Sequence, residues 1–132
     1  MNYLLDTHTL IWSILENKKL SPLVKQALNN QDNSIFVSAI TFWEIALKFS
    51  TEKLELKGIL PEDFPRLSLL SDYKLLQLSA DESATYHNLL KTLHRDPFDR
   101  MIIWQAINHN YTLISKDAQM ALYEEAGLKI FW

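Results

Sequence analysis

The sequence predicts a three-layer α/β domain, with a mostly parallel sheet of about five strands flanked by helices. Two observations predict this fold class: short apolar runs recur along the chain, and stretches with helical spacing separate them. A third observation is length, because 132 residues suffice for one hydrophobic core and are too few for two. We therefore expect a single domain over residues 1–132.

The predicted strands are short apolar runs that polar residues bring to an end. They are expected over residues 2–5, 35–37, 75–78, 111–115 and 128–132. Strands that alternate with helices pair in parallel, since the helix supplies the crossover connection. In such sheets the ligand site lies beyond the carboxyl ends of the strands.

The predicted helices fill the intervals between these strands. They are expected over residues 10–15, 22–28, 38–50, from 61 onward, 81–93, 97–107 and 118–126. Asp96-Pro97 marks one start, because aspartate caps free amide groups and proline is tolerated at the first helical position. The segment 81–93 is expected to be one amphipathic helix whose inward side chains are Ala84, Leu89, Leu90 and Leu93.

Cysteine content and apolar run lengths exclude several classes of protein. The chain has no cysteine, which rules out a disulfide framework and thiolate metal sites and fits a reducing compartment. It has no basic leader before an apolar run, and no apolar run near the ~20 residues that cross a bilayer. We therefore expect a cytoplasmic protein with no membrane partner.

Charge and glycine content restrict how the chain can bind nucleotides and nucleic acids. A net charge of −3 argues against nucleic-acid binding through a broad positive field. It is compatible with a nuclease whose acids hold a divalent cation, because the cation reverses the local sign. With only Gly58 and Gly127, the chain lacks the glycine-rich loop of Rossmann and P-loop proteins.

Four acidic residues are candidates for one shared site. Asp6 and Asp117 each follow a predicted strand. Asp99 opens the helix before the fourth strand, and Glu44 lies in the helix after the second. Each acid also has a purely structural explanation, such as capping a helix or, for Glu44, pairing with Lys48 four residues on.

Convergence of these acids would require a balancing charge. Two carboxylates 4 Å apart repel by about 4 kcal/mol at an effective dielectric near 20. Some of them must then take up protons, or a cation must lie among them. Oxygen ligands without cysteine or a histidine pair suit Mg²⁺ or Mn²⁺ rather than Zn²⁺.

Four motifs carry a family resemblance that extends over the whole chain. They are Leu4-Leu5-Asp6-Thr7-His8, Trp43-Glu44-Ile45-Ala46-Leu47-Lys48, the stretch from His94 to Ala106, and Ile114-Ser115-Lys116-Asp117. In that order they resemble the motifs of a PIN domain, closest to the VapC-like toxin branch of bacterial toxin–antitoxin systems. The resemblance implies a PIN-like parallel sheet and an endoribonuclease that uses Mg²⁺ or Mn²⁺ to cut RNA. It also implies a homodimer and inhibition by a cognate antitoxin protein.

The resemblance also implies roles for particular residues. The acidic quartet that would be catalytic and bind metal is Asp6, Glu44, Asp99 and Asp117. We expect Asp6 and Asp99 to be direct ligands, and the other two to complete the shell through water or to bind a second ion.

The neighbours of this quartet have supporting roles. Asp96 matches an extra acid of the branch, and we expect it mainly to cap its helix. Thr7 is expected to bond to Asp6 or to a water held by the cation. Ser115 stands where many relatives carry threonine and keeps the hydroxyl. The expected contacts to RNA phosphates are Arg95, Arg100 and Lys116.

The sequence fits three other functional classes to different degrees. A haloacid-dehalogenase-type phosphatase needs a second aspartate two residues after the first, where this chain has His8. A receiver domain needs an acidic neighbour that Asp6 lacks. The strongest alternative is a catalytically silent PIN-like domain that binds metal or a partner and cuts nothing. A neighbouring gene for a small DNA-binding antitoxin would favour the toxin.

Overall fold

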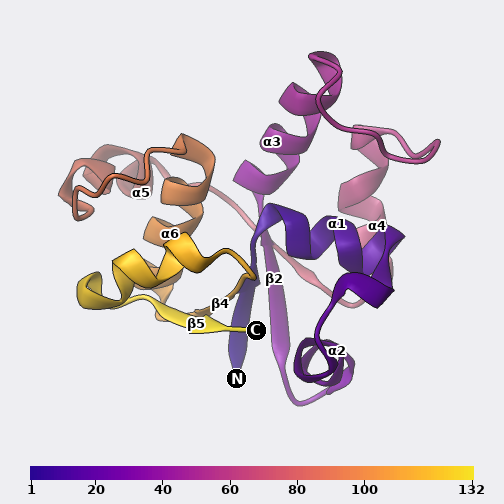
Figure 1. Cartoon of the computed structure of the whole chain (residues 1–132), viewed down its shortest axis with the longest axis horizontal. Coiled ribbons are helices and arrows are strands. Elements are labelled where there is room, and N and C mark those ends of the chain that lie inside the picture. Colours follow the sequence, from indigo (N-terminus) through magenta and orange to yellow (C-terminus); the bar gives the residue numbers. More distant parts are fainter.

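The structure is a computed structural model that describes residues 1–132, and strands alternate with helices along it (Figure 1). The strands are β1 (Asn2–Leu5), β2 (Ser34–Ser38), β3 (Lys74–Leu76), β4 (Thr112–Ile114) and β5 (Lys129–Phe131). The α-helices are α1 (Thr7–Leu15), α2 (Pro22–Asn29), α3 (Ala39–Ser50), α4 (Phe64–Leu70), α5 (Ala80–Thr85) and α6 (Pro97–His109). The 3₁₀ helices are η1 (Asn17–Lys19), η2 (Pro61–Asp63), η3 (Tyr86–Asn88) and η4 (Ala118–Ala126).

The five strands form one parallel sheet in the order β3-β2-β1-β4-β5. On β1, Tyr3 pairs with Ile35 on one side and with Thr112 on the other. The predicted fold class is therefore confirmed. Strand order runs outward in both directions from β1, so a crevice opens beside its carboxyl end, where open α/β sheets bind their ligands.

Two hydrophobic cores cover the two faces of the sheet. Successive side chains of a strand point to opposite faces. Accordingly Tyr3 and Leu5 belong to the core under α1, α2 and α4, whereas Leu4 belongs to the core under α6 and η4. Figure 1 shows α1, α2 and α4 on one side of the strands and α5 and α6 on the other, with α3 rising beyond the strand ends.

Side-chain caps start the helices that surround the crevice. Asp6 accepts from Thr9 at the start of α1, Ser38 from Ile40 at the start of α3, and Asp96 caps α6 ahead of Pro97. Such caps satisfy amides that have no partner within the helix. No helix in the chain has the combination of length and apolar sequence that a membrane crossing needs.

The prediction of one amphipathic helix over residues 81–93 is wrong. Helix α5 ends at Thr85 and a turn of η3 follows it; of the four expected inward side chains only Leu89 is buried, and Leu93 is 91% exposed. The chain leaves helical geometry at Leu89, whose φ of −65° and ψ of 134° are extended. Arg100, from another element, then donates to the carbonyl of Leu90 (3.1 Å).

Candidate active site

Asp6 lies at the junction of β1 and α1 and is buried. One carboxylate oxygen accepts the amide of Thr9 (2.8 Å), and the other accepts the hydroxyl of Ser115 (2.5 Å). Burial raises the pKa of Asp6 above its ordinary value, although the bonds from Ser115 and Thr9 act in the opposite direction. This acid is fixed in place and poorly hydrated.

Glu44 is buried in the middle of α3, where both of its oxygens have partners. Thr7 donates its hydroxyl to one oxygen (2.5 Å), whereas a bond to Asp6 or to a water held by the cation was predicted, and Lys48 forms an ion pair with the other. Partial burial works to lower the pKa of Lys48, but its bond to Glu44 raises it overall. Glu44 can therefore form the ion pair with Lys48 and still be part of the candidate site.

Asp99 lies in the first turn of α6, and its carboxylate has one partner, Nε2 of His94 at 3.2 Å. Its pKa is raised to about 7, mainly by burial and then by the negative charges around it. In decreasing order of effect, those charges belong to Asp96, Glu44, Asp6 and Asp117. The acids are close enough to act on one another.

Asp117 follows β4 and caps η4, where it accepts the amide of Gln119 (2.9 Å). Its own amide donates to the Ser115 hydroxyl (3.1 Å), which in turn donates to Asp6. One buried hydroxyl thus ties together the ends of β1 and β4. Asp117 is exposed, so its second oxygen faces solvent.

Part of this set has the spacing that a divalent cation needs. One ligand atom each from His94, Asp99 and Asp117 lies within 4.8 Å of the others, whereas Asp6 and Glu44 belong to no group of three ligand atoms at that spacing. The pKa of Asp99 is raised first by burial and then by the negative charges of the neighbouring acids, and a cation would offset that second effect. In addition, Thr41 Oγ1 is buried without a hydrogen-bond partner on the face of α3 that carries Glu44 three residues on.

Some of the predicted supporting residues already have hydrogen-bond partners within the protein, and others are exposed. Asp96 accepts the amides of Phe98 and Asp99 with one oxygen, which is the expected cap. Arg100 is not free, because it donates to Tyr86 (2.9 Å), to Tyr123 (2.9 Å) and to the Leu90 carbonyl.

Arg95 and Lys116, by contrast, are exposed and lie on cavity walls near the acids. A cavity of about 410 Å³ is lined by Asp6, His8, Trp12, Lys116 and Asp117. A second, of about 250 Å³, is lined by Tyr86, Lys91, Thr92, His94, Arg95 and Arg100. In the first cavity the basic Lys116 lies beside two acids, whereas the second is lined by basic and neutral side chains without an acid.

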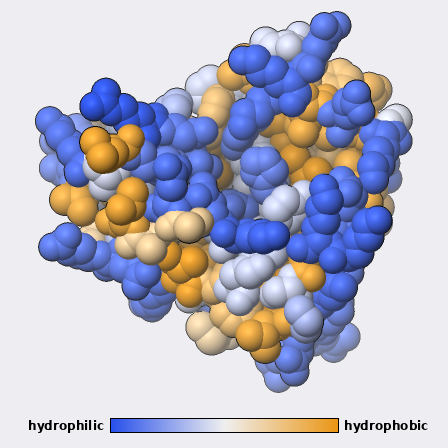
Figure 2. Space-filling model, in the orientation of Figure 1, coloured by the Kyte–Doolittle hydropathy of each residue, from blue (hydrophilic) through white to orange (hydrophobic).

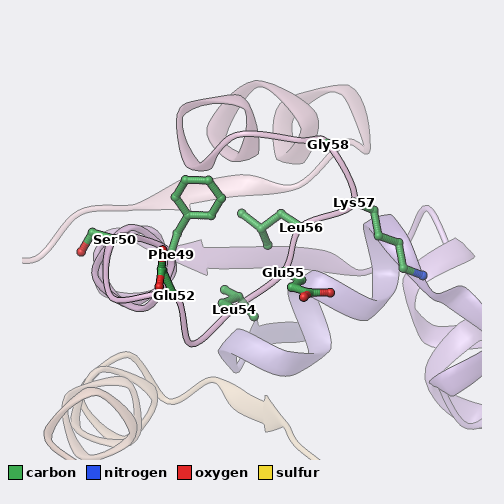
Figure 3. A pocket seen from close by; sticks show the side chains of 8 residues that line it. All are labelled: Phe49, Ser50, Glu52, Leu54, Glu55, Leu56, Lys57 and Gly58. Carbon is green, nitrogen blue, oxygen red and sulfur yellow. The ribbon is translucent and has the colours of Figure 1, made fainter.

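The largest cavity lies away from the acids. It measures about 720 Å³ and is formed by the end of α3 and the connector that follows. In Figure 3, Phe49, Leu54 and Leu56 point into one concavity, whereas Lys57 points away from it. The rest of its lining is polar or glycine, and no member of the acidic quartet lines it.

Sequence reasoning missed two side chains that contact the acids or their partners. His94 was part of a motif, but nothing in its spacing shows that its ring reaches Asp99. Tyr123 lies 29 residues from His94 and had no recognisable signal. Contacts between side chains of different elements leave no periodic pattern.

The fold and the acids define a parallel α/β domain with a carboxylate site at its strand ends. The model of the PIN domain family matches residues 3–126. Ribonuclease VapC22 of Mycobacterium tuberculosis (strain ATCC 25618 / H37Rv) is 30% identical over 133 residues, 98% of this chain and 97% of the relative. The chain therefore belongs to the PIN domain family, which confirms the resemblance of its four motifs.

Solved structures share the fold at lower identity. VapBC2 from Rickettsia felis, bound to a DNA fragment from its promoter, matches with a TM-score of 0.71 at 21% identity, over 99% of this chain and 98% of that one. DNA-bound VapBC from Salmonella typhimurium matches with a TM-score of 0.68 at 19% identity, over 99% and 97% of the two chains. At these identities the likeness concerns the fold.

Proposed function

We propose that this chain is a metal-dependent endoribonuclease, the toxin of a toxin–antitoxin pair, that hydrolyses RNA phosphodiester bonds at the site of Asp6, Glu44, Asp99 and Asp117. The observation that carries the proposal is the carboxylate cluster at the strand ends, with the Asp99 pKa raised to about 7. A relative named as a ribonuclease, aligned over 98% of the chain, supports it.

The protein residues would divide the work between holding a cation and holding RNA. Asp6 and Asp99 would bind Mg²⁺ or Mn²⁺ directly, and Glu44 and Asp117 would complete the shell through water or a second ion. When bound, the cation polarises the phosphodiester and lowers the pKa of a water molecule, which is the chemistry that hydrolysis needs.

The free basic side chains would hold the substrate. Arg95 and Lys116 are exposed on cavity walls and can bind phosphates on either side of the scissile bond. Arg100 would act indirectly, since its guanidinium is already bonded within the protein. Single-stranded RNA is the expected substrate class, because its flexible backbone can enter a concave acidic site.

Incubation with RNA tests the proposal directly. Purified protein is mixed with defined single-stranded RNAs with and without millimolar Mn²⁺, and the cut ends are mapped. We expect cleavage that requires the metal and is lost in Asp99→Asn. The silent alternative predicts a metal-induced rise in melting temperature with no cleavage of any RNA. No metal-induced stabilisation and no cleavage would contradict both readings.

We further propose that a cognate antitoxin covers the site. An antitoxin arginine inserted among the acids would bind carboxylates with its planar fork of donors, where the cation would otherwise lie. An amphipathic helix of the antitoxin would then bury apolar surface nearby. Figure 2 shows apolar surface gathered over α3 and α4, and the exposed apolar residues there include Leu47, Leu69 and Leu70.

A titration of the purified pair tests this mode of inhibition. RNA cleavage is measured at several concentrations of antitoxin and of Mn²⁺. We expect competition between the two, and weaker inhibition when the arginine is changed to alanine. Inhibition that changes neither with the Mn²⁺ concentration nor with loss of the arginine would mean that the antitoxin binds away from the acids.

A homodimer is the assembly expected for this branch, and sedimentation equilibrium of the toxin alone tests it.

A further inference from the structure

Asp99 is held differently from the other acids of the site. Asp6 and Asp117 each accept a backbone amide, and Glu44 accepts a hydroxyl and pairs with a lysine. The Asp99 carboxylate has only His94, whose Nε2 lies 3.2 Å from Oδ2. When Asp99 is ionised, as it must be to hold a cation, its oxygens can only accept, and Nε2 is then the donor of this bond.

His94 in turn is fixed from its other side. Its ring is buried, with Nδ1 3.0 Å from the hydroxyl of Tyr123 and the two rings packed edge to face. The Thr92 hydroxyl donates to the backbone carbonyl of His94 (3.1 Å). The Tyr123 hydroxyl also lies 2.9 Å from Thr92 Oγ1 and 3.2 Å from the His94 carbonyl, so its single proton has three acceptors within reach. Donation to Nδ1 is the arrangement in which Nε2 carries the ring proton.

Arg100 completes the arrangement. It donates to the Tyr123 oxygen (2.9 Å), and a guanidinium can only donate. Contacts thus connect Arg100 through Tyr123 and His94 to Asp99, and with Tyr123 donating to Nδ1 all of them donate in that direction. The chain of bonds begins and ends on neighbouring residues of α6, and it passes through η4, which Asp117 caps.

We propose that His94, held by Tyr123, is a positioning residue for Asp99. It occupies Oδ2, fixes the rotation of the carboxylate and leaves Oδ1 as the oxygen that binds the cation. Partners of this kind orient metal ligands, and their loss weakens metal binding by about 10–100-fold. The inference rests on the proposed metal-dependent function.

Two isosteric substitutions separate positioning from general stability. In His94→Gln the side-chain amide nitrogen lies close to the place of Nε2 and can still donate to Asp99. In His94→Asn the amide lies near the place of Nδ1, so it can reach Tyr123 but not Asp99. The probe is Mn²⁺ itself, titrated into RNA-free protein and followed by the loss of the free-ion electron paramagnetic resonance signal.

We expect His94→Asn to weaken Mn²⁺ binding by about 10–100-fold and His94→Gln to restore it to within about threefold of the native protein. Tyr123→Phe keeps the ring packing and removes the hydroxyl, so an intermediate loss of about tenfold is expected. His109→Asn is the matched control, because His109 pairs with Glu82 outside the site and should leave Mn²⁺ binding unchanged.

Three results would overturn the inference alone. The first is unchanged Mn²⁺ binding in His94→Asn. The second is equal weakening of Mn²⁺ binding in the asparagine and glutamine variants, with equal loss of melting temperature. The third is nitrogen coupling from the His94 ring in the Mn²⁺ spin-echo spectrum, which would make His94 a ligand. If the native protein binds no Mn²⁺, the metal dependence of the proposed function fails, and this inference fails with it.

Discussion

The two sides of the site hold their acids in different ways. Where β1 and β4 end, Asp6 and Asp117 each cap the helix that follows and share the hydroxyl of Ser115. On the opposite side Asp99 has no cap to make, because Asp96 already caps α6, and it depends on His94. Bonds to backbone amides therefore hold Asp6 and Asp117 in position, whereas a bond to another side chain holds Asp99.

The largest expected effect separates Asp99 from Asp96. Asp99→Asn removes a metal-binding charge and should lower the rate of RNA cleavage about a thousandfold, equivalent to about 4 kcal/mol. Asp96→Asn should retain most activity, because asparagine and aspartate are similarly good caps. Cleavage rates at saturating Mn²⁺, with circular dichroism as the folding control, test the pair. Equal losses would mean that Asp96 also binds the metal.

The raised pKa of Asp99 predicts a pH-dependent cost in the metal-free protein. The native carboxyl keeps its proton up to about pH 7, whereas the unfolded chain releases it near the ordinary value of 3.8. Between these values the native state binds more protons, so its stability falls as pH rises. The loss at this carboxyl should be on the order of 3 kcal/mol across that range.

Urea unfolding in EDTA at several pH values from about 4 to 8 measures this loss. Asp99→Asn should flatten the profile, because asparagine does not titrate. Mn²⁺ should raise stability most at the high end of the range, where the carboxyl is ionised and available to the cation. A native profile as flat as that of Asp99→Asn would show that Asp99 is not strained by its neighbours.

Substitution of Ser115 tests the side of the site formed by Asp6 and Asp117. Ser115→Ala removes a buried hydroxyl that bonds to Asp6 and to the Asp117 amide, and should lower the free energy of unfolding by about 1–3 kcal/mol. Asp6 and Asp117 keep their caps, so Mn²⁺ binding should weaken less than in His94→Asn. Ser115→Thr keeps the hydroxyl and serves as the control. A larger metal defect in Ser115→Ala than in His94→Asn would reverse the comparison.

The smallest expected effect is on RNA binding at the rim. Lys116→Gln removes an exposed charge beside Asp117 and should weaken RNA binding a fewfold. It should also lower the slope of the logarithm of the RNA binding constant against the logarithm of the salt concentration by about one. Its stability should not change. Lys129→Gln, on the exposed surface of β5, is the control for lost charge alone. Equal effects of the two substitutions would place the RNA elsewhere.

The same division explains what the sequence could predict. Asp6 and Asp117 were placed correctly at strand ends, because strand periodicity and parallel pairing bring those ends to one edge of the sheet. The helix start at Asp96-Pro97 was equally visible, since a cap is a local signal.

The failures fall on the other side of the site. The segment 81–93 leaves helical geometry at Leu89 and is joined to α6 by the bonds of Arg100 to Tyr86 and to the Leu90 carbonyl, which local propensity does not record. The ion pair of Glu44 with Lys48 does not separate it from the other acids, since the charge of Glu44 also helps to raise the pKa of Asp99. These contacts depend on where elements pack, which a pattern along one segment does not record.

The bond from Ser115 to Asp6 joins residues 109 apart, and this separation bears on how the protein is made. At about 5–20 residues per second, the ribosome needs roughly 5–20 s to add the intervening chain. During that time β1 has β2 beside it but lacks β4, and Asp6 lacks both Ser115 and Asp117. The proposed site is therefore incomplete in a nascent chain. Cleavage of the messenger RNA at that site would have to wait until most of the protein has emerged from the ribosome.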